Sequence, residues 1–166
     1  MFTAKYQRRT LLRNASLAAL CAVVTGLVAT TAQAGECPAD KVATNAITEG
    51  PSEPIGVTDM VLNAIDLSKQ AVKLDHRMFR LRRLEIAPGG VVPFHEHSDR
   101  PALIFMIKGT AIEYSSNCTV PIVHKTGEAA AESIGLSHWW RNDTNETVVL
   151  ISADILNTKM EKGDVM

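Results

Sequence analysis

The chain has 166 residues, of which 46% are hydrophobic, and it carries 17 Lys and Arg against 18 Asp and Glu. This length allows one folded domain with a sizeable core. Residues 1–34 contain four basic residues and no acidic one, so residues 35–166 carry 13 basic and 18 acidic residues, a net charge of −5 with neutral histidines. That balance excludes nucleic acid and an anionic membrane surface as expected partners.

An export signal is predicted at residues 1–34. Arg8 and Arg9 precede an uncharged stretch rich in Ala, Leu and Val, which ends in a small-x-small cleavage pattern. The paired arginines resemble a twin-arginine signal, which bacteria use for protein export. We therefore expect cleavage after Ala34, a periplasmic or secreted mature protein that begins at Gly35, and no stable membrane association afterwards. A Sec signal and a retained membrane anchor are the alternatives.

Two cysteines, Cys37 and Cys118, remain after the predicted cleavage. An even number of cysteines in an oxidising compartment predicts a disulfide bond. Such a bond would tie the N-terminal segment to a loop of the folded domain. Two free thiols remain the alternative, because the sequence does not show whether the two Cα atoms approach each other.

An extended N-terminal arm is predicted at residues 35–56, which contain Pro and Gly and few apolar residues. Short apolar segments bounded by turn residues follow it, and they predict strands at 57–65, 78–86, 91–97, 102–107, 111–114, 120–124, 129–134, 137–142 and 147–156. Short strands at this spacing indicate an all-β sandwich or barrel over residues 57–158. Residues 159–166 are assigned to a C-terminal tail.

Three histidines form the candidate functional site. His95 and His97 lie two residues apart in a predicted strand, so their side chains point to the same face. His138, in a distant strand, supplies a third imidazole. Neutral imidazole is the commonest metal-donating side chain, and three of them with open coordination positions make a reactive or ligand-binding metal site.

The residues around these histidines resemble the two motifs of the cupin superfamily. The first motif is matched by Gly89, His95, His97 and Gly109. The second motif is matched by Gly127, Gly135, His138 and Asn142, with Ser133 in place of a Pro. The resemblance implies a double-stranded β-helix, also called a jelly-roll barrel, that holds one divalent transition metal ion through His95, His97 and His138.

Ala102 departs from the family pattern, because it stands where the first motif has a Glu. Without that acid, three neutral imidazoles leave a divalent ion its full charge, and we expect an open site that favours anionic ligands. Glu113, Tyr114 and Glu132 are the nearest substitutes, but none stands at the family position. The ligand set does not distinguish Mn, Fe, Zn, Ni and Cu.

Other polar residues near the motifs are expected to lie outside the site. Glu96 alternates with the two histidines of its strand, so it is expected to point away from them. His76 and His124 are expected at the surface. The basic residues Arg77, Arg80, Arg82 and Arg83 alternate with apolar residues, which favours one solvated strand face.

A turn at Asp99 and Arg100 is predicted at the mouth of the barrel. The two side chains are interpreted as an ion pair that stabilises the turn, with a clamp for a substrate carboxylate as the alternative.

These features predict an exported metal-binding cupin that acts on a small molecule, with an anionic molecule as one option. The candidate activities are a metal-dependent dioxygenase and an isomerase-like enzyme. The alternative is a non-enzymatic module that binds a small ligand or a metal, because no acid–base residue is evident on the motif strands. No catalytic residue is assigned, and a homodimer is left open.

Overall fold

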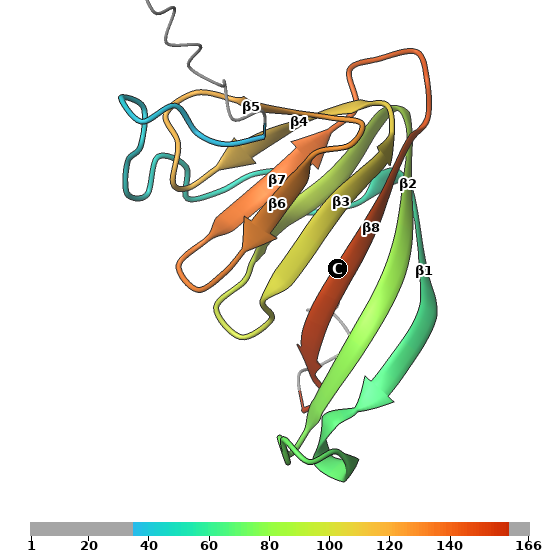
Figure 1. Ribbon diagram of the computed structural model, residues 1–166. Coiled ribbons are helices and arrows are strands. Elements are labelled where there is room, and N and C mark those ends of the chain that lie inside the picture. Colours follow the sequence, from blue (N-terminus) through green and yellow to red (C-terminus); the bar gives the residue numbers. More distant parts are fainter. Residues whose placement is uncertain (1–34, 160–166) are drawn as a thin grey trace, which may run out of the picture. The chain divides into compact units, whose positions relative to one another are not determined.

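The computed structural model describes residues 35–159 (Figure 1). The predicted export signal at 1–34 and residues 160–166 of the predicted tail lie outside the described residues. The described residues form these elements: β1 (Ile55–Asp66), η1 (Leu67–Lys69), β2 (Arg77–Glu96), β3 (Ala102–Lys108), β4 (Thr110–Ser115), β5 (Ile122–Lys125), β6 (Ala129–Glu132), β7 (Ser137–Arg141) and β8 (Val148–Asn157). Across residues 35–159, no helix has the length and apolar character needed to cross a membrane.

The strands form one sheet that curls into a nearly closed barrel. Their order is β5-β4-β7-β2-β8-β3-β6, and β1 pairs with β2 outside this path. All of these pairs are antiparallel, although β3 and β6, which lie side by side, are separated in the chain by β4 and β5. Such crossing connections are typical of a jelly roll. The predicted all-β jelly-roll barrel is therefore confirmed.

Strand β2 differs from the prediction, because the two strands expected at 78–86 and 91–97 are one continuous strand. Gly89 and Gly90 bend this strand without ending it. Gly89 has a φ of 73°, and a Cβ on Gly90 would lie 2.8 Å from the carbonyl oxygen of Ala87, so glycine suits both positions. Before the bend β2 pairs with β8, and after it β2 pairs with β7. One strand thus joins the two halves of the barrel.

The apolar core lies inside the barrel. Side chains of β2, β3 and β8 alternate between buried and more exposed positions, as expected for strands with one face on a core. The buried cluster consists of Leu84, Ile86, Val92, Ile104, Met106, Ala111, Trp140, Val148 and Leu150. Five members of this cluster also line a cavity inside the barrel: Leu84, Val92, Ile104, Trp140 and Leu150.

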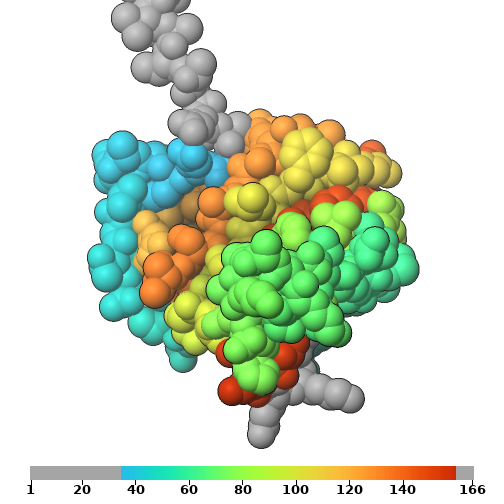
Figure 2. All heavy atoms as spheres, turned by 60° about the horizontal axis from the view of Figure 1, so that its bottom comes forward, coloured from blue at the N-terminus to red at the C-terminus, as the bar shows by residue number. Residues whose placement is uncertain are grey.

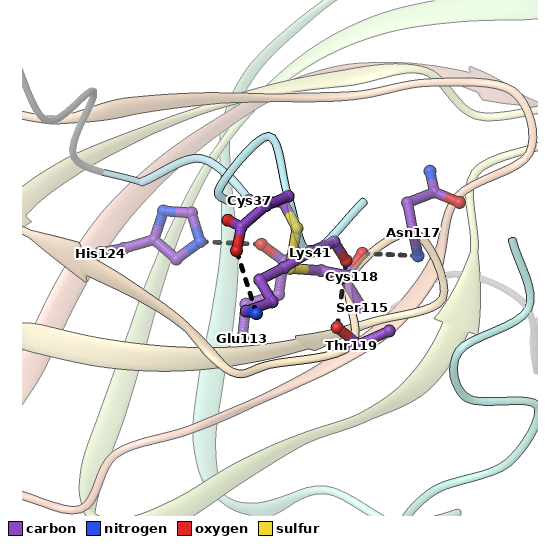
Figure 3. Close-up of a disulfide and its surroundings, with 9 residues drawn as sticks. Cys37, Lys41, Glu113, Ser115, Asn117, Cys118, Thr119 and His124 are labelled. Atoms are coloured by element: carbon purple, nitrogen blue, oxygen red, sulfur yellow. Dashed lines mark hydrogen bonds and ion pairs between the residues drawn. A yellow bond between two sulfur atoms is a disulfide. The ribbon is translucent and has the colours of Figure 1, made fainter. Parts of the chain in front are cut away.

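The N-terminal arm lies against the strands that follow β3, as the blue and cyan segment beside the gold and orange ones shows (Figure 2). Val42 forms a β-bridge with Cys118, and the Ala43 N–H donates a hydrogen bond of 3.0 Å to the Asn117 carbonyl. The predicted Cys37–Cys118 disulfide is present, with the two Cα atoms 5.7 Å apart (Figure 3). It ties the arm to the loop after β4, as expected.

Candidate metal centre

The three predicted histidines meet inside the barrel. His95 in β2 and His138 in β7 are direct partners in the antiparallel ladder, and His97 follows just after the end of β2. The three ring centroids are 4.7 to 4.9 Å apart, and one nitrogen of each ring lies within 4.8 Å of the others. We call these residues the histidine cluster. The structure therefore brings together side chains that are 43 residues apart in the sequence.

Each ring of the histidine cluster has its Nδ1 atom next to an acceptor. The acceptors are the Pro93 carbonyl, the Arg100 carbonyl and the Glu113 carboxylate, at 2.8, 2.8 and 2.7 Å from His95, His97 and His138, respectively. Carbonyl oxygens accept hydrogen bonds, which assigns the proton of neutral His95 and His97 to Nδ1. Nδ1 of His138 lies between the Glu113 carboxylate and the Nε1–H of Trp140, which is 3.1 Å away, and the closer carboxylate favours the proton on Nδ1 there as well. The lone pair is then on Nε2, the nitrogen left for a metal.

The Nε2 atoms of the cluster point at one another. Nε2 of His138 lies 3.0 Å from Nε2 of His97 and 3.3 Å from Nε2 of His95. Burial, together with the neighbouring His138, lowers the pKa of His95 from 6.5 to about 2 and that of His97 to about 3. These two rings are therefore neutral at physiological pH, and a neutral imidazole is the form that binds a metal.

Glu132 also faces the histidine cluster. Its Oε2 atom lies 3.2 Å from Nε2 of His97, and its Oε1 atom lies 3.5 Å from Nε2 of His138. Glu132 at the end of β6 is the direct ladder partner of Ala102 in β3, and both are buried. The expectation that the site lacks an acid beside Ala102 is therefore wrong, because the neighbouring strand supplies one.

Sequence reasoning names Glu132 but assigns it no role. The only signal was an acid in a predicted strand, six residues before a candidate ligand. Glu132 faces the histidines only because β6 pairs with β3. This pairing is not evident from the sequence, because β4 and β5 separate the two strands in the chain.

Glu113 in β4 connects two buried histidines. One oxygen accepts from Nδ1–H of His138 at 2.7 Å, and the other accepts from Nε2–H of His124 at 2.8 Å. Burial alone would raise the pKa of Glu113, but the hydrogen bonds from the two histidines lower it to about 2, so it is ionised. A carboxylate on the outer nitrogen of a ligating histidine fixes the orientation of the ring and increases its basicity.

His124 is buried, so its predicted place at the surface is wrong. Its ring stacks on Trp140 with centroids 4.3 Å apart. The Glu113 carboxylate accepts a hydrogen bond from its Nε2–H (Figure 3). His76 is exposed and Glu96 is exposed, as predicted. Tyr114, the third substitute acid considered from the sequence, stacks on Trp139 with centroids 4.0 Å apart.

A second buried polar group lies in the other half of β2. Asp154 in β8 is fully buried, and its Oδ2 atom lies 2.6 Å from Arg80, 3.1 Å from Arg82 and 3.4 Å from Arg100. We call these four residues the arginine cluster. Burial alone would raise the pKa of Asp154, but the hydrogen bonds from Arg80 and the charges of the three guanidinium groups lower it. Arg82 also pairs with Asp59 in β1.

The predicted solvated arginine face is therefore wrong for Arg80 and Arg82, which point into the barrel. They share the inner face of β2 with the core residues Leu84 and Ile86, and their ladder partners in β8 are Asp154 and Ser152. The carboxylate of Asp154 makes this burial possible. Arg77 and Arg83, on either side of them, are partly exposed and pair with Asp99 and Glu85.

Asp99 and Arg100, which are predicted to pair with each other in the turn, have other ion-pair partners. Asp99 binds Arg77 and accepts a hydrogen bond of 2.6 Å from Asn157. Arg100 is 2% exposed, its guanidinium faces Asp154, and its carbonyl accepts from His97. Arg100 thus belongs to the interior rather than to the mouth of the barrel, and it contacts both clusters.

A cavity of about 30 Å³ lies between the two clusters. Its polar wall consists of His95, His97, Glu132, Arg82 and Ser152. The apolar wall consists of Leu84, Val92, Ile104, Trp140 and Leu150. A water molecule needs roughly 10–15 Å³ by this measure, so the cavity admits about two or three groups of that size beside the histidines.

The Cupin domain family matches residues 82–154. This range includes all three predicted metal ligands and every residue that lines the cavity. No curated protein matches the chain.

Solved structures with a similar fold include a Bacillus halodurans protein, at 16% identity over 46% of this chain with a TM-score of 0.43; this chain covers 61% of that protein. A Cupin_2 domain of an XRE family transcriptional regulator from Enterobacter cloacae is 13% identical over 60% of this chain and 95% of its own, with a TM-score of 0.47. A predicted oxalate decarboxylase from Thermotoga maritima is 18% identical over 69% of this chain and 98% of its own, with a TM-score of 0.49. Similarity this low carries no argument about function.

Proposed function

This chain belongs to the cupin superfamily, and we propose that it is a metal-dependent cupin that acts on a small molecule. In this proposal one divalent transition metal ion is bound by His95, His97 and His138. The observation that carries it is the convergence of three Nε2 lone pairs, with the opposite nitrogen of each ring held by an acceptor. Neutral acceptors this close repel one another, and a cation between them relieves that repulsion.

The donor set fits a divalent transition metal, because imidazole nitrogen suits zinc, copper, iron and nickel, and a carboxylate nearby also suits manganese. When bound, such an ion polarises a ligand and stabilises negative charge that develops on it. The protein's own part is orientation: Glu113 fixes His138, and the carbonyls of Pro93 and Arg100 fix the other two rings.

The cavity wall supports a small substrate with both a polar and an apolar part. Arg82 and Ser152 form one side of it, and Trp140 and aliphatic side chains form the other. A guanidinium at the wall favours an anionic group such as a carboxylate. With the metal on one side and Arg82 on the other, such a group would be held between two positive charges. A metal-dependent dioxygenase and an isomerase-like enzyme are the activities that we propose to test.

A non-enzymatic binding module is the second candidate, and the composition of the cavity wall favours it. Apart from the histidines and Glu132, the only titratable side chain that the described residues place in this wall is Arg82, which stays protonated. If Glu132 is occupied by the metal, the wall offers no general acid or base. Oxygen uptake by metal-loaded protein that depends on an added small carboxylate would favour the enzyme, and saturable binding without turnover would favour the module.

We also propose export through the predicted signal, with a mature protein that starts at Gly35 in the periplasm or outside the cell. The Cys37–Cys118 disulfide supports this, because such bonds persist in oxidising compartments. N-terminal sequencing of the exported protein should find Gly35. Replacing Arg8 and Arg9 by Lys should block export by the twin-arginine route, and undiminished export would assign the protein to the Sec route.

The metal content of protein purified after export tests the proposed site. We expect about one equivalent of transition metal per chain in the wild type, and loss of most of it in His95→Ala and in His138→Ala. His76→Ala is the matched control, because it removes an exposed histidine. Unchanged metal content in both cluster variants would contradict the proposal.

A further inference from the structure

The ladder between β3 and β6 places Glu132 opposite the position where the cupin motif has its acid. Ala102 and Glu132 are direct partners, and both side chains are buried. Directly opposed residues on one face of an antiparallel pair have Cβ atoms roughly 4.5–5.5 Å apart. A carboxylate on residue 132 can therefore reach the same region as a carboxylate on residue 102, provided that residue 102 is small. Alanine leaves that room.

We infer that Glu132 is a fourth metal ligand, which β6 supplies in place of the acid that β3 lacks at Ala102. The inference rests on the proposed metal site, and it adds a ligand that lies outside the sequence motif. Two of the four ligands would then belong to the β2 segment, and the other two, Glu132 and His138, to the short segment that runs from β6 into β7.

The contacts of Glu132 support a ligand role. Its two oxygens lie 3.2 and 3.5 Å from Nε2 of His97 and Nε2 of His138. With the proton of each ring on Nδ1, these nitrogens carry lone pairs, and the carboxylate and both imidazoles then present lone pairs to the same point. The side chain is 6% exposed, and a buried ionised carboxylate is stable only beside a cation or hydrogen-bond donors. A metal ion among these atoms removes the conflict, because it accepts electron pairs from the imidazoles and the carboxylate together.

The charges around Glu132 oppose one another. Burial raises the pKa of Glu132 and Glu113 adds to this, while His138, Arg100 and Arg82 offset the rise only in part. A divalent cation at the histidine cluster would add to the effect of the two arginines. The alternative is a protonated Glu132 that donates a hydrogen bond to His97 and has only a structural role. The two roles differ in what happens to the metal when the carboxylate is removed.

An anionic ligand changes the site from the open one expected with Ala102. It offsets one charge of the ion, so an external anion is attracted less strongly than by three histidines alone. It also occupies one coordination position. Removing the carboxylate should therefore weaken metal binding and, at saturating metal, strengthen the binding of a small anion such as azide.

The test uses the mature wild-type protein, stripped of metal and titrated with Co²⁺, with absorption spectroscopy and calorimetry as readouts. Glu113→Gln removes an outer partner of His138 and should weaken Co²⁺ affinity by roughly 10–100-fold. Glu132→Ala should weaken it more than that and change the Co²⁺ spectrum. Glu96→Gln is the matched control, because Glu96 lies between His95 and His97 in sequence but is exposed.

The double variant Ala102→Glu/Glu132→Ala decides between the two roles. If Glu132 is a ligand, moving the carboxylate back to residue 102 should restore most of the lost affinity and a spectrum close to the wild type. If Glu132→Ala does not fold, Glu132→Gln, which keeps the shape and removes the charge, gives the same comparison. Azide affinity of the Co²⁺-loaded protein should rise in Glu132→Gln.

Two results would overturn the inference. One is wild-type Co²⁺ affinity and azide affinity in Glu132→Gln. The other is a folded double variant in which affinity does not recover. Both leave the proposed function intact as long as His95→Ala and His138→Ala lose the metal. If those two variants keep it, the proposed function itself fails.

Discussion

The two polar clusters inside the barrel differ in how their groups are satisfied. In the arginine cluster, the guanidinium groups meet the carboxylates of Asp154 and Asp59. In the histidine cluster, three lone-pair nitrogens and a carboxylate face one another within 3.0 to 3.5 Å. The first cluster is complementary within the chain, and the second becomes complementary when a cation is added.

Whether the buried polar groups are paired within the chain distinguishes a structural cluster from a candidate binding site better than the degree of burial does. All members of both clusters are buried except His95, which is partly exposed, and β2 contributes residues to both clusters. The arginine cluster follows the general rule that buried charges are paired, and among its described donors only Nε of Arg82 lacks an acceptor. In the histidine cluster, the Nε2 atoms and the Glu132 carboxylate converge beside a cavity instead, which supports the proposal of a bound cation there.

The largest effect is expected when the arginine cluster is broken. Asp154→Asn leaves three buried guanidinium groups with too little negative charge, and removing one partner of a buried ion pair costs about 3–5 kcal/mol of unfolding free energy. Urea denaturation of metal-free protein measures this loss. Asp40→Asn, which removes an exposed pair with Lys41, is the control and should change little.

Urea denaturation of a histidine-cluster variant tests whether the two clusters differ in their contribution to stability. His95→Gln in metal-free protein should cost much less than Asp154→Asn, because it removes one of several facing acceptors and leaves no charge unpaired. A loss of stability as large as that of Asp154→Asn would mean that the histidine cluster also holds the fold together. The distinction between the two clusters would then be wrong.

A middle-sized effect is expected from the disulfide, which lies outside both clusters. The double variant Cys37→Ala/Cys118→Ala should lose about 2–4 kcal/mol of unfolding free energy, because the bond restricts the unfolded chain. Its metal affinity should stay at the wild-type value, since no ligand is touched. Urea denaturation and Co²⁺ titration test the two parts.

A large loss of metal affinity in this variant would show instead that the arm supports the site. Alkylation of the exported wild type without reductant, followed by intact-mass measurement, should find both thiols protected.

Much of the fold and the core of the site follow from the sequence, because both depend on local patterns. Alternating strands and turn residues predicted the barrel, and the two motifs predicted His95, His97 and His138. The bend of β2 was missed because Pro88, Gly89 and Gly90 are turn residues, and such residues normally end a strand. Here the strand continues because it changes partner from β8 to β7.

The errors share one cause, which is pairing between segments far apart in the chain. Arg80 and Arg82 are predicted to be solvated because they alternate with apolar residues, but their side chains point inward, where Asp154 in β8 lies beside them. His124 is predicted at the surface because it precedes a turn and lies outside both motifs, but its partners in β4 and β7 make it a buried residue. Glu132 was discounted because its place opposite Ala102 depends on β3 and β6 being neighbours. In each case the sequence shows the type of side chain, but it does not show which distant residue lies next to it in the fold.

The smallest expected effect is the pH dependence of the unfolding free energy of metal-free protein. It also tests the comparison between the two clusters. In the unfolded chain a histidine takes up a proton near pH 6.5, but in the folded protein the pKa of His95 is lowered to about 2 and that of His97 to about 3. Below pH 6.5 the unfolded state therefore binds more protons, and the folded state loses stability as the pH falls. Between pH 6.5 and 5.5 this amounts to about 1 kcal/mol for each histidine.

The contribution of the arginine cluster to the unfolding free energy should not change with pH in the same range. The pKa of Asp154 is lowered from 3.8, so its contribution to stability is complete above that value and is lost only as the pH falls below it. Urea denaturation between pH 7 and 5 should show a slope in the wild type that is reduced by about half in His95→Gln, since one of the two histidines is gone. An equal slope in both proteins would mean that His95 titrates normally, and that the histidine cluster is open to water rather than held dry for a metal.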